Sequence, residues 1–204
     1  MLENFLACYP HAAPDLYVSL AYNFTGGSLF RWVRDTFAKV EQQEADRQGV
    51  DVYELLTAEM AEEPTDLIVQ PHFTMTGSPY MDPNPVGAII GLTLSTTRGQ
   101  IFRAVLEGIS YEMKLNLEIM TRAGVEVREF RAIGGGAKSD FWLQLKADMY
   151  NRPVVRLQVA EAASLGMAIC AGVALDVYKS EAEAAERLVA KTETFDPDPA
   201  RAAC

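Results

Sequence analysis

The clearest periodic pattern of apolar residues runs from Thr97 to Arg122. Its apolar stripe is formed by Ile101, Val105, Ile109, Met113 and Leu117, and it is widened by Phe102, Leu106 and Met120. Most of them recur at four-residue spacing, which places them on one side of a helix. The sequence therefore predicts a long core helix here.

Shorter patterns predict strands that alternate with helices. In the first part of the chain we expect strands at 16–22, 67–70 and 88–94, a helix from Leu29 that ends before Gly49, and a short helix at 52–60. After Gly124 we expect strands at 125–133 and 153–157 and helices at 139–150, 162–174 and 181–190. Such alternation predicts an α/β architecture whose sheet is at least partly parallel.

Two stretches are predicted to be irregular. Residues 74–87 contain three prolines and two glycines, which are incompatible with a regular element. The tail from Thr192 contains Asp196-Pro-Asp-Pro and is predicted to form no helix or strand.

The composition is that of a globular protein. The 204 residues suffice for one large or two small domains, and 49% are hydrophobic against 23% charged, which excludes disorder as the main state. The formal net charge of −10 disfavours non-specific binding to nucleic acid or to an anionic membrane. Much of the negative charge lies between Glu41 and Asp66, where a solvated outer face is expected.

Cysteine and histidine usage favours a reducing compartment without a protein-held metal. Cys8, Cys170 and Cys204 are far apart in sequence, and His11 and His72 have no second ligand at metal-binding spacing. No apolar run approaches the length of a membrane span, and the first residues lack the basic region of a signal peptide. We therefore expect a cytoplasmic protein.

Three consecutive glycines, Gly134 to Gly136, separate a predicted strand from a predicted helix. Backbone without side chains allows a ligand to approach closely, and the first N–H groups of a helix can face a phosphate. A tight turn without a ligand is the alternative. The stretch fits neither a P-loop, because Lys138 does not follow a glycine, nor a dinucleotide fingerprint, because the expected acidic residue is missing.

Several other side chains are candidates for either packing or function. We favour packing for Trp32, Trp142 and His72, a structural pair for Arg103 with Glu107 and for Gln144 with Asp148, and either phosphate or solvent for Lys138.

Taken together, these motifs resemble the C-terminal domain of the FGGY carbohydrate kinases. The resemblance is carried by the segment from Ile133 to Val154, by Glu161-Ala-Ala-Ser-Leu-Gly-Met-Ala168, by Thr25-Gly-Gly-Ser-Leu-Phe-Arg-Trp32 and by the stretch from Pro71 to Ile109. The matching segments occur in the expected order between about Leu16 and Ala174.

The resemblance implies a fold and a set of binding residues. Residues 1–204 would form an RNase H-like (actin-like ATPase) α/β domain with a mixed sheet flanked by helices, which binds ATP with Mg²⁺. Gly135, Gly136 and Ala137 would lie against adenine and ribose, and Asp140 would supply a polar contact to adenine. Gly27 would approach the phosphates, with Arg31 one helical turn further on, although a solvated Arg31 is the alternative.

The resemblance also implies what the chain lacks. The sugar or polyol site and the catalytic aspartate are expected in an N-terminal domain outside residues 1–204, so we expect no catalytic residue here and no activity of the chain alone. A non-catalytic actin-like nucleotide-binding or interaction module is the alternative, with the acidic stretch Glu41 to Asp66 as its surface. A degenerate dinucleotide-binding domain is disfavoured. A homodimer is expected, because a former domain interface would be exposed.

Overall fold

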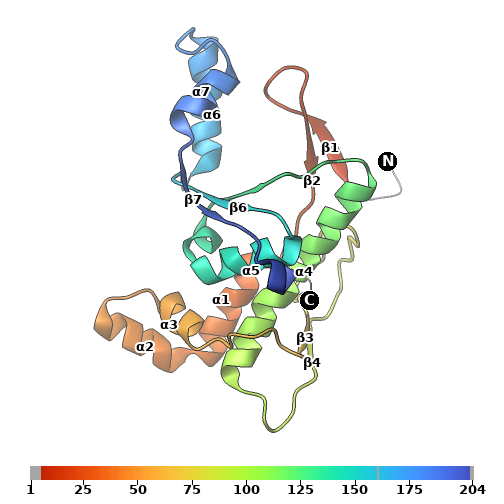
Figure 1. Ribbon diagram of the computed structural model, residues 1–204, viewed down its shortest axis with the longest axis vertical. Coiled ribbons are helices and arrows are strands. Elements are labelled where there is room, and N and C mark those ends of the chain that lie inside the picture. Colours follow the sequence, from red (N-terminus) through yellow and green to blue (C-terminus); the bar gives the residue numbers. More distant parts are fainter. Residues whose placement is uncertain (1–5, 160, 203–204) are drawn as a thin grey trace. The chain divides into compact units, whose positions relative to one another are not determined.

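The computed structural model describes residues 6–159 and 161–202 (Figure 1). Contacts within the chain divide these residues into two compact units. The first unit comprises residues 21–126 together with Leu6. The second comprises residues 7–20 and the described residues from 127 onward. Both units contain helices and strands, as an α/β chain should.

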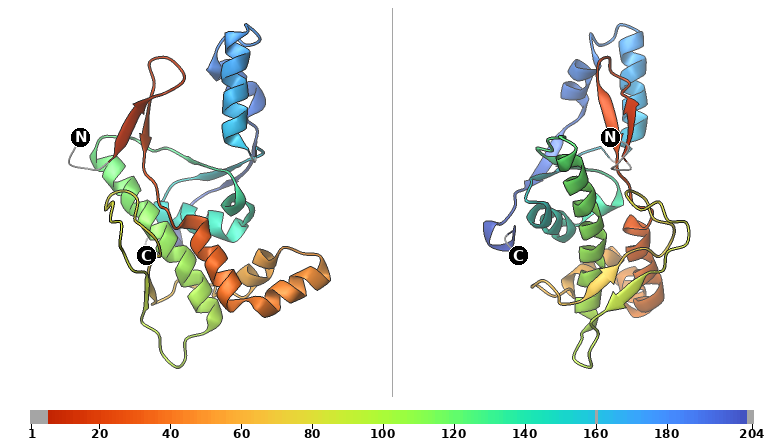
Figure 2. Two further views of the ribbon diagram at one scale, coloured as in Figure 1. Left: turned by 180° about the vertical axis from the view of Figure 1, so that it is seen from behind. Right: turned by 90° about the vertical axis from the view of Figure 1, so that its right-hand side faces the viewer.

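The first unit is built around a long helix. Its elements are α1 (Gly26–Phe37), α2 (Lys39–Gln48), α3 (Val52–Ala58), β3 (Ile68–Gln70), β4 (Ala88–Ile90) and α4 (Arg98–Arg122). Strands β3 and β4 pair in antiparallel orientation, with Val69 opposite Ile89. Helix α4 packs against α1, α3 and β3, and the right-hand view of Figure 2 shows it (green) beside the two short strands.

The predicted core helix is confirmed as α4, and its start is well capped. Thr97 and Gln100 form a capping box, in which each side chain accepts a hydrogen bond from the other residue's backbone N–H. Two glycines allow close packing along the helix. A Cβ atom at Gly99 would lie 2.0 Å from the carbonyl oxygen of Glu59, and one at Gly108 would lie 2.6 Å from that of Val69.

The helix predicted from Leu29 to the residue before Gly49 is two helices. The backbone leaves the helical conformation at the buried Ala38, where φ is −123° and ψ is 40°. The apolar stripe also ends early, because Phe37 is 49% exposed and Val40 is 71% exposed. The predicted end is correct, since Gly49 closes α2 in the left-handed conformation with φ of 70°.

The second unit contains a three-stranded sheet and a separate hairpin. Its elements are β1 (Ala7–Pro10), β2 (Tyr17–Leu20), β5 (Phe130–Ala132), a 3₁₀ helix η2 (Gly135–Lys138), α5 (Asp140–Tyr150), β6 (Val154–Leu157), α6 (Ala162–Ala174), α7 (Glu181–Leu188), β7 (Lys191–Phe195) and α8 (Pro199–Ala202). The sheet order is β5-β6-β7, with β5 parallel to β6 and β7 antiparallel to it. The predicted parallel pairing is thus confirmed, within a mixed sheet. Its core is formed by Leu143, Ala147, Val154 and Phe195.

Two strands of this unit were not predicted. Strand β1 pairs with β2 as an antiparallel hairpin. The tail from Thr192 was expected to be irregular, but Lys191–Phe195 forms β7 and Pro199–Ala202 forms α8. Strand β7 is held by backbone pairing to β6, and Phe195 is its one buried side chain.

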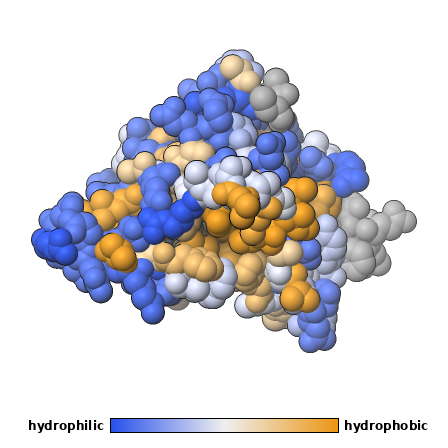
Figure 3. Space-filling view, turned by 90° about the horizontal axis from the view of Figure 1, so that it is seen from below, coloured by the Kyte–Doolittle hydropathy of each residue, from blue (hydrophilic) through white to orange (hydrophobic). Residues whose placement is uncertain are grey.

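Apolar side chains are exposed on parts of the surface. In the first unit Ile68, Ile90, Leu92 and Leu94 are all more than half exposed. Figure 3 shows apolar side chains gathered on the face seen from below, with hydrophilic side chains around them. Trp32, predicted to be a core residue, is also 41% exposed and lies at the surface with its ring against Phe37 and Phe73. Within residues 6–159 and 161–202, no helix is long and apolar enough to cross a membrane.

Candidate functional site

The glycine stretch forms a turn between β5 and α5, as predicted. Gly134 has φ of 74° and ψ of −164°, a conformation that is essentially restricted to glycine. Its carbonyl oxygen accepts a hydrogen bond from the Ala137 N–H at 3.1 Å, which closes the 3₁₀ turn. Ser139 then caps α5, because its Oγ accepts from the Trp142 N–H at 3.2 Å.

The three residues predicted to contact adenosine have different surroundings. Gly135 is exposed, and nothing lies within 4 Å of the position that a Cβ atom would take. Gly136 faces Trp142, whose Cζ3 would be 3.0 Å from such an atom. The side chain of Ala137 is buried. Gly135 is therefore the residue of the three that leaves the backbone open to a ligand.

Asp140, the predicted contact to adenine, is the first residue of α5 and forms an ion pair with Arg156. Its side chain is 70% exposed. Arg156 also donates from Nε to the carbonyl oxygen of Ala137 at 2.8 Å and from Nη1 to Glu193 at 2.8 Å. Sequence reasoning missed Arg156, because its partners lie far from it along the chain.

Trp142 is buried, as predicted, and carries a cation on one side. The Nζ atom of Lys146 lies 3.8 Å from the centroid of the Trp142 ring. Burial lowers the pKa of Lys146 to about 8, so the ammonium form still predominates at neutral pH. The indole that supports Gly136 is thus itself in contact with a positive charge.

Gln144 and Asp148 have the structural role that we favoured. Gln144 donates from Nε2 to Asp148 Oδ1 at 2.7 Å and to the carbonyl oxygen of Asp196 at 2.8 Å. The same Asp148 oxygen accepts from the Asp198 N–H at 2.8 Å. These contacts attach the segment after β7 to α5.

Gly27 and Arg31, predicted to meet phosphates, lie on the first two turns of α1 in the first unit. Both are exposed, and nothing lies within 4 Å of a Cβ atom at Gly27. Across residues 6–159 and 161–202, no hydrogen bond or ion pair involves the Arg31 guanidinium. This helix face is therefore available to an anion, and a solvated Arg31 is equally compatible with it.

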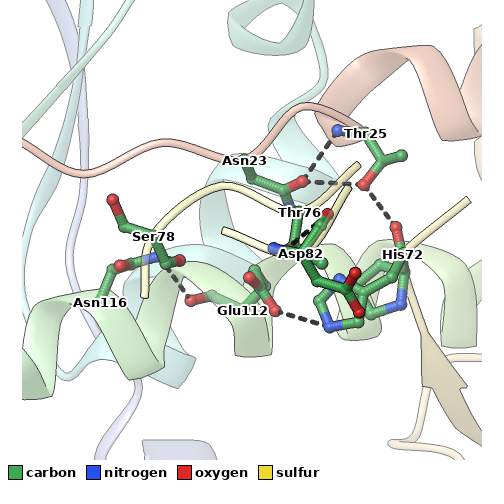
Figure 4. A network of polar contacts seen from close by, with 9 residues as sticks. Asn23, Thr25, His72, Thr76, Ser78, Asp82, Glu112 and Asn116 are labelled. Atoms are coloured by element: carbon green, nitrogen blue, oxygen red, sulfur yellow. Dashed lines mark hydrogen bonds and ion pairs between the residues drawn. The ribbon is translucent and has the colours of Figure 1, made fainter. Parts of the chain in front are cut away.

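The start of α1 is fixed by buried polar contacts (Figure 4). Thr25, the residue before the helix, donates its N–H to Asn23 Oδ1 at 2.8 Å. Its hydroxyl also contacts the carbonyl oxygen of Pro71. These contacts hold Gly26 and Gly27, the first residues of α1, next to the beginning of the loop 71–87.

The next residue of that loop, His72, faces a carboxyl group on α4. His72 Nε2 lies 3.5 Å from Glu112 Oε2, and both side chains are largely buried (Figure 4). Burial raises the pKa of Glu112 to about 7. Burial also lowers the pKa of His72, against the opposing effect of the charge on Asp82. A packed interior histidine, as predicted, is what the structure contains.

The rest of the loop is irregular, as predicted, yet well ordered by side chains. Asp82 donates its N–H to Thr76 Oγ1 at 2.7 Å, and Thr76 donates its own N–H to the Asp82 carbonyl oxygen at 2.9 Å. Asn116 of α4 donates from Nδ2 to the Ser78 carbonyl oxygen at 3.0 Å. Glu112 and Asn116 were missed, although two polar residues four apart on an apolar helix were a detectable signal.

The predicted pair of Arg103 and Glu107 is confirmed as a buried ion pair with 2.7 Å between Nε and Oε1. Glu107 also accepts from the Thr65 hydroxyl at 2.8 Å, and Arg103 donates to the carbonyl oxygens of Ala61 and Glu62. The pair therefore holds the segment before β3 against α4, which is a structural role.

Comparison with protein families identifies the chain. The sequence model of the C-terminal domain of the FGGY family of carbohydrate kinases matches residues 5–175. The chain belongs to this family. The FGGY match covers the glycine turn, α1 and the polar network around His72, so each of these features lies within the shared domain.

Relatives of the chain are named as kinases of small polyols and sugars. It is 38% identical to a glycerol kinase of Ralstonia pickettii over 175 residues, which is 85% of this chain and 33% of that protein. It is 33% identical to a xylulose kinase of Staphylococcus epidermidis over 196 residues, which is 96% of this chain and 38% of that protein. The match thus spans only 33% and 38% of the length of these relatives.

A solved structure has the same fold. The xylulose kinase of Lactobacillus acidophilus matches with a TM-score of 0.82 and 24% identity, over 98% of this chain and 39% of that one. In the present chain, the turn with Gly135, Gly136, Ala137 and Asp140 belongs to the second unit, whereas Gly27 and Arg31 belong to the first. Within each unit, the structure therefore places the predicted site residues near one another. That the two sets form one site stays a prediction.

Proposed function

We propose that this chain is the nucleotide-binding domain of an ATP-dependent carbohydrate kinase with an RNase H-like, actin-type fold. The whole protein would transfer the γ-phosphoryl group of ATP to a hydroxyl of a sugar or polyol. Membership of the FGGY family supports the reaction class. The observation that carries the nucleotide assignment is the open turn at Gly135, where bare backbone faces free space at the end of a strand.

Each site residue has a role in this proposal. The backbone of Gly135 to Ala137 lies against adenosine, and the Asp140 carboxylate accepts a hydrogen bond from the exocyclic amino group of adenine. At α1, the bare helix start at Gly27 admits the phosphates, and the free guanidinium of Arg31 pairs with their oxygens. Mg²⁺ bound with the nucleotide would neutralise phosphate charge beside Gly27 and Arg31.

Catalysis in this proposal needs groups outside the chain. Phosphoryl transfer to a hydroxyl requires a carboxylate that takes the hydroxyl proton, and a pocket for the acceptor. We assign both to the N-terminal domain of the whole protein, so the chain alone binds nucleotide but transfers nothing. The cytoplasmic location and the homodimer stay predictions.

Isothermal titration of the chain with ADP tests the nucleotide assignment. A Cβ atom at position 135 meets nothing within 4 Å, so a leucine would extend into the open approach and Gly135→Leu should abolish the binding heat. The matched control is Gly166→Leu in α6, because a Cβ atom at Gly166 also meets nothing within 4 Å. The proposal fails if the unmodified chain gives no heat at millimolar ADP, or if Gly135→Leu binds ADP as well as the unmodified chain does.

The same design separates the alternative of a non-catalytic module. Both candidates predict ADP binding by the chain. Only the kinase predicts that the whole protein forms ADP from ATP faster when a sugar or polyol is added, and that the Gly135→Leu substitution removes this stimulation.

A further inference from the structure

Arg156 connects several parts of the second unit around the glycine turn. It lies on β6 directly opposite Ala132, the last residue of β5, so its side chain starts beside the strand end where the turn begins. Its guanidinium contacts the Ala137 carbonyl oxygen, the Asp140 carboxylate and the Glu193 carboxylate. The guanidinium carbon also lies 5.2 Å from the centroid of the Phe195 ring.

These contacts fix two groups that border the turn. Ala137 lies in the 3₁₀ helix η2, and Asp140 opens α5. A guanidinium holds its donors in one plane, so binding both groups at once sets the position of one relative to the other. Glu193 and the ring of Phe195 in turn restrain the guanidinium.

The hydrogen-bond pattern leaves one carboxylate oxygen of Asp140 unused. Arg156 binds Oδ1, and none of the residues described in the structure donates a hydrogen bond to Oδ2. A carboxylate oxygen accepts hydrogen bonds but cannot donate them. Oδ2 can therefore accept a hydrogen bond from an amino group on the edge of a bound purine. A carbonyl oxygen at the same position of the purine would be repelled.

We infer that Arg156 is a positioning residue that sets base selectivity: by holding Asp140 and the Ala137 carbonyl in place, it makes the site prefer a 6-amino purine to a 6-oxo purine. This inference rests on the proposed function. Without Arg156, the Asp140 side chain, already 70% exposed, would rotate freely, and the preference would weaken.

Affinities of the full chain for ADP and IDP, from fluorescence titration with a labelled ADP as competitor, test this role. The unmodified chain should bind ADP about tenfold more tightly than IDP, a ratio typical of one charged hydrogen bond. Arg156→Met should lower the ADP affinity and bring the ratio close to one. The control is Arg131→Met on β5, because Arg131 pairs with Glu129 at 2.8 Å and should leave the ratio unchanged.

A second background distinguishes positioning from general support of the fold. With Asp140→Ala present, Arg156→Met should change the ratio of the ADP and IDP affinities no further. Loss of a merely structural residue would instead weaken the binding of both nucleotides in either background. Should Arg156→Met not fold, Arg156→Lys keeps the charge but cannot hold both groups, and it should give an intermediate ratio.

The results separate the inference from the proposal beneath it. Absence of ADP binding by the unmodified chain overturns both. The unmodified chain can also bind ADP and keep its preference for ADP over IDP after Arg156→Met, or keep that preference unchanged after Arg156→Lys. Either result overturns the inference and leaves the proposed function standing.

Discussion

Replacing Glu112 by glutamine should change how the stability of the protein depends on pH. The Glu112 carboxyl is buried on α4 beside His72, and burial raises its pKa from the ordinary 4.5 to about 7. An acid whose pKa is raised in the folded state stabilises the fold below its unfolded pKa, and this contribution is lost as the pH rises through the folded pKa. Glutamine has a similar shape and does not titrate.

The magnitude follows from the two pKa values. With pKa values of 4.5 unfolded and about 7 folded, linkage gives a loss of about 2 kcal/mol between about pH 5.5 and about pH 8.5. The unmodified protein should lose this amount relative to Glu112→Gln over the same interval. The opposite titration of His72, whose pKa is lowered by burial, occurs in both proteins and largely cancels in the comparison.

Urea unfolding at the two pH values, followed by hydrogen exchange of the α4 amides, provides the assay. Exchange reports the local opening free energy of α4 even if the two units unfold separately. Glu118→Gln is the control, because Glu118 lies on the same helix with an exposed side chain. Parallel pH dependence in all three proteins would refute the reasoning and mean that Glu112 is ionised in the folded state at pH 5.5.

Three further predictions concern strain, buried charge and phosphate binding. Gly134→Ala should lower the free energy of unfolding by about 1–3 kcal/mol, because its backbone conformation is restricted to glycine; a urea midpoint equal to that of the unmodified protein would contradict this. Glu107→Ala should cost about 3–5 kcal/mol in thermal or urea unfolding, because Arg103 is left buried without its carboxylate; a loss below about 1 kcal/mol would show that Arg103 is satisfied by carbonyl oxygens alone. Arg31→Ala should weaken ADP binding severalfold in a competition titration and leave adenosine binding unchanged, and equal loss for both ligands would exclude a phosphate contact.

Elements with a strong local pattern could be predicted from the sequence. Helix α4 follows from its apolar spacing and the cap at Thr97, and the turn before α5 follows from three glycines between a strand and a helix. Both depend on interactions within a few residues, and such interactions are visible in a single sequence.

Elements held by distant partners were missed. Strand β7 carries mostly charged and polar side chains, and its stability comes from hydrogen bonds to β6, more than thirty residues earlier in the chain. The break at Ala38 likewise depends on what the two flanking helices pack against, since neither proline nor glycine is present there.

The candidate site shows the same division. The resemblance selected Gly135 and Asp140, but it gave no indication that Arg156 holds Asp140, because a cross-strand contact depends on register. It also did not indicate that Gly134 carries the special backbone conformation. Local sequence identified the turn, and only the fold revealed what holds it.

The glycines of α4 have a consequence for movement within the first unit. Gly99 and Gly108 leave no room between the helix and the backbones of Glu59 and Val69, and a peptide backbone cannot swing aside as a flexible side chain does. These two points lie roughly 13 Å apart along the helix axis and prevent α4 from sliding in either direction. Glu112 and Asn116 therefore keep their register with the loop that they contact, so a displacement of the helix would have to carry these contacts along.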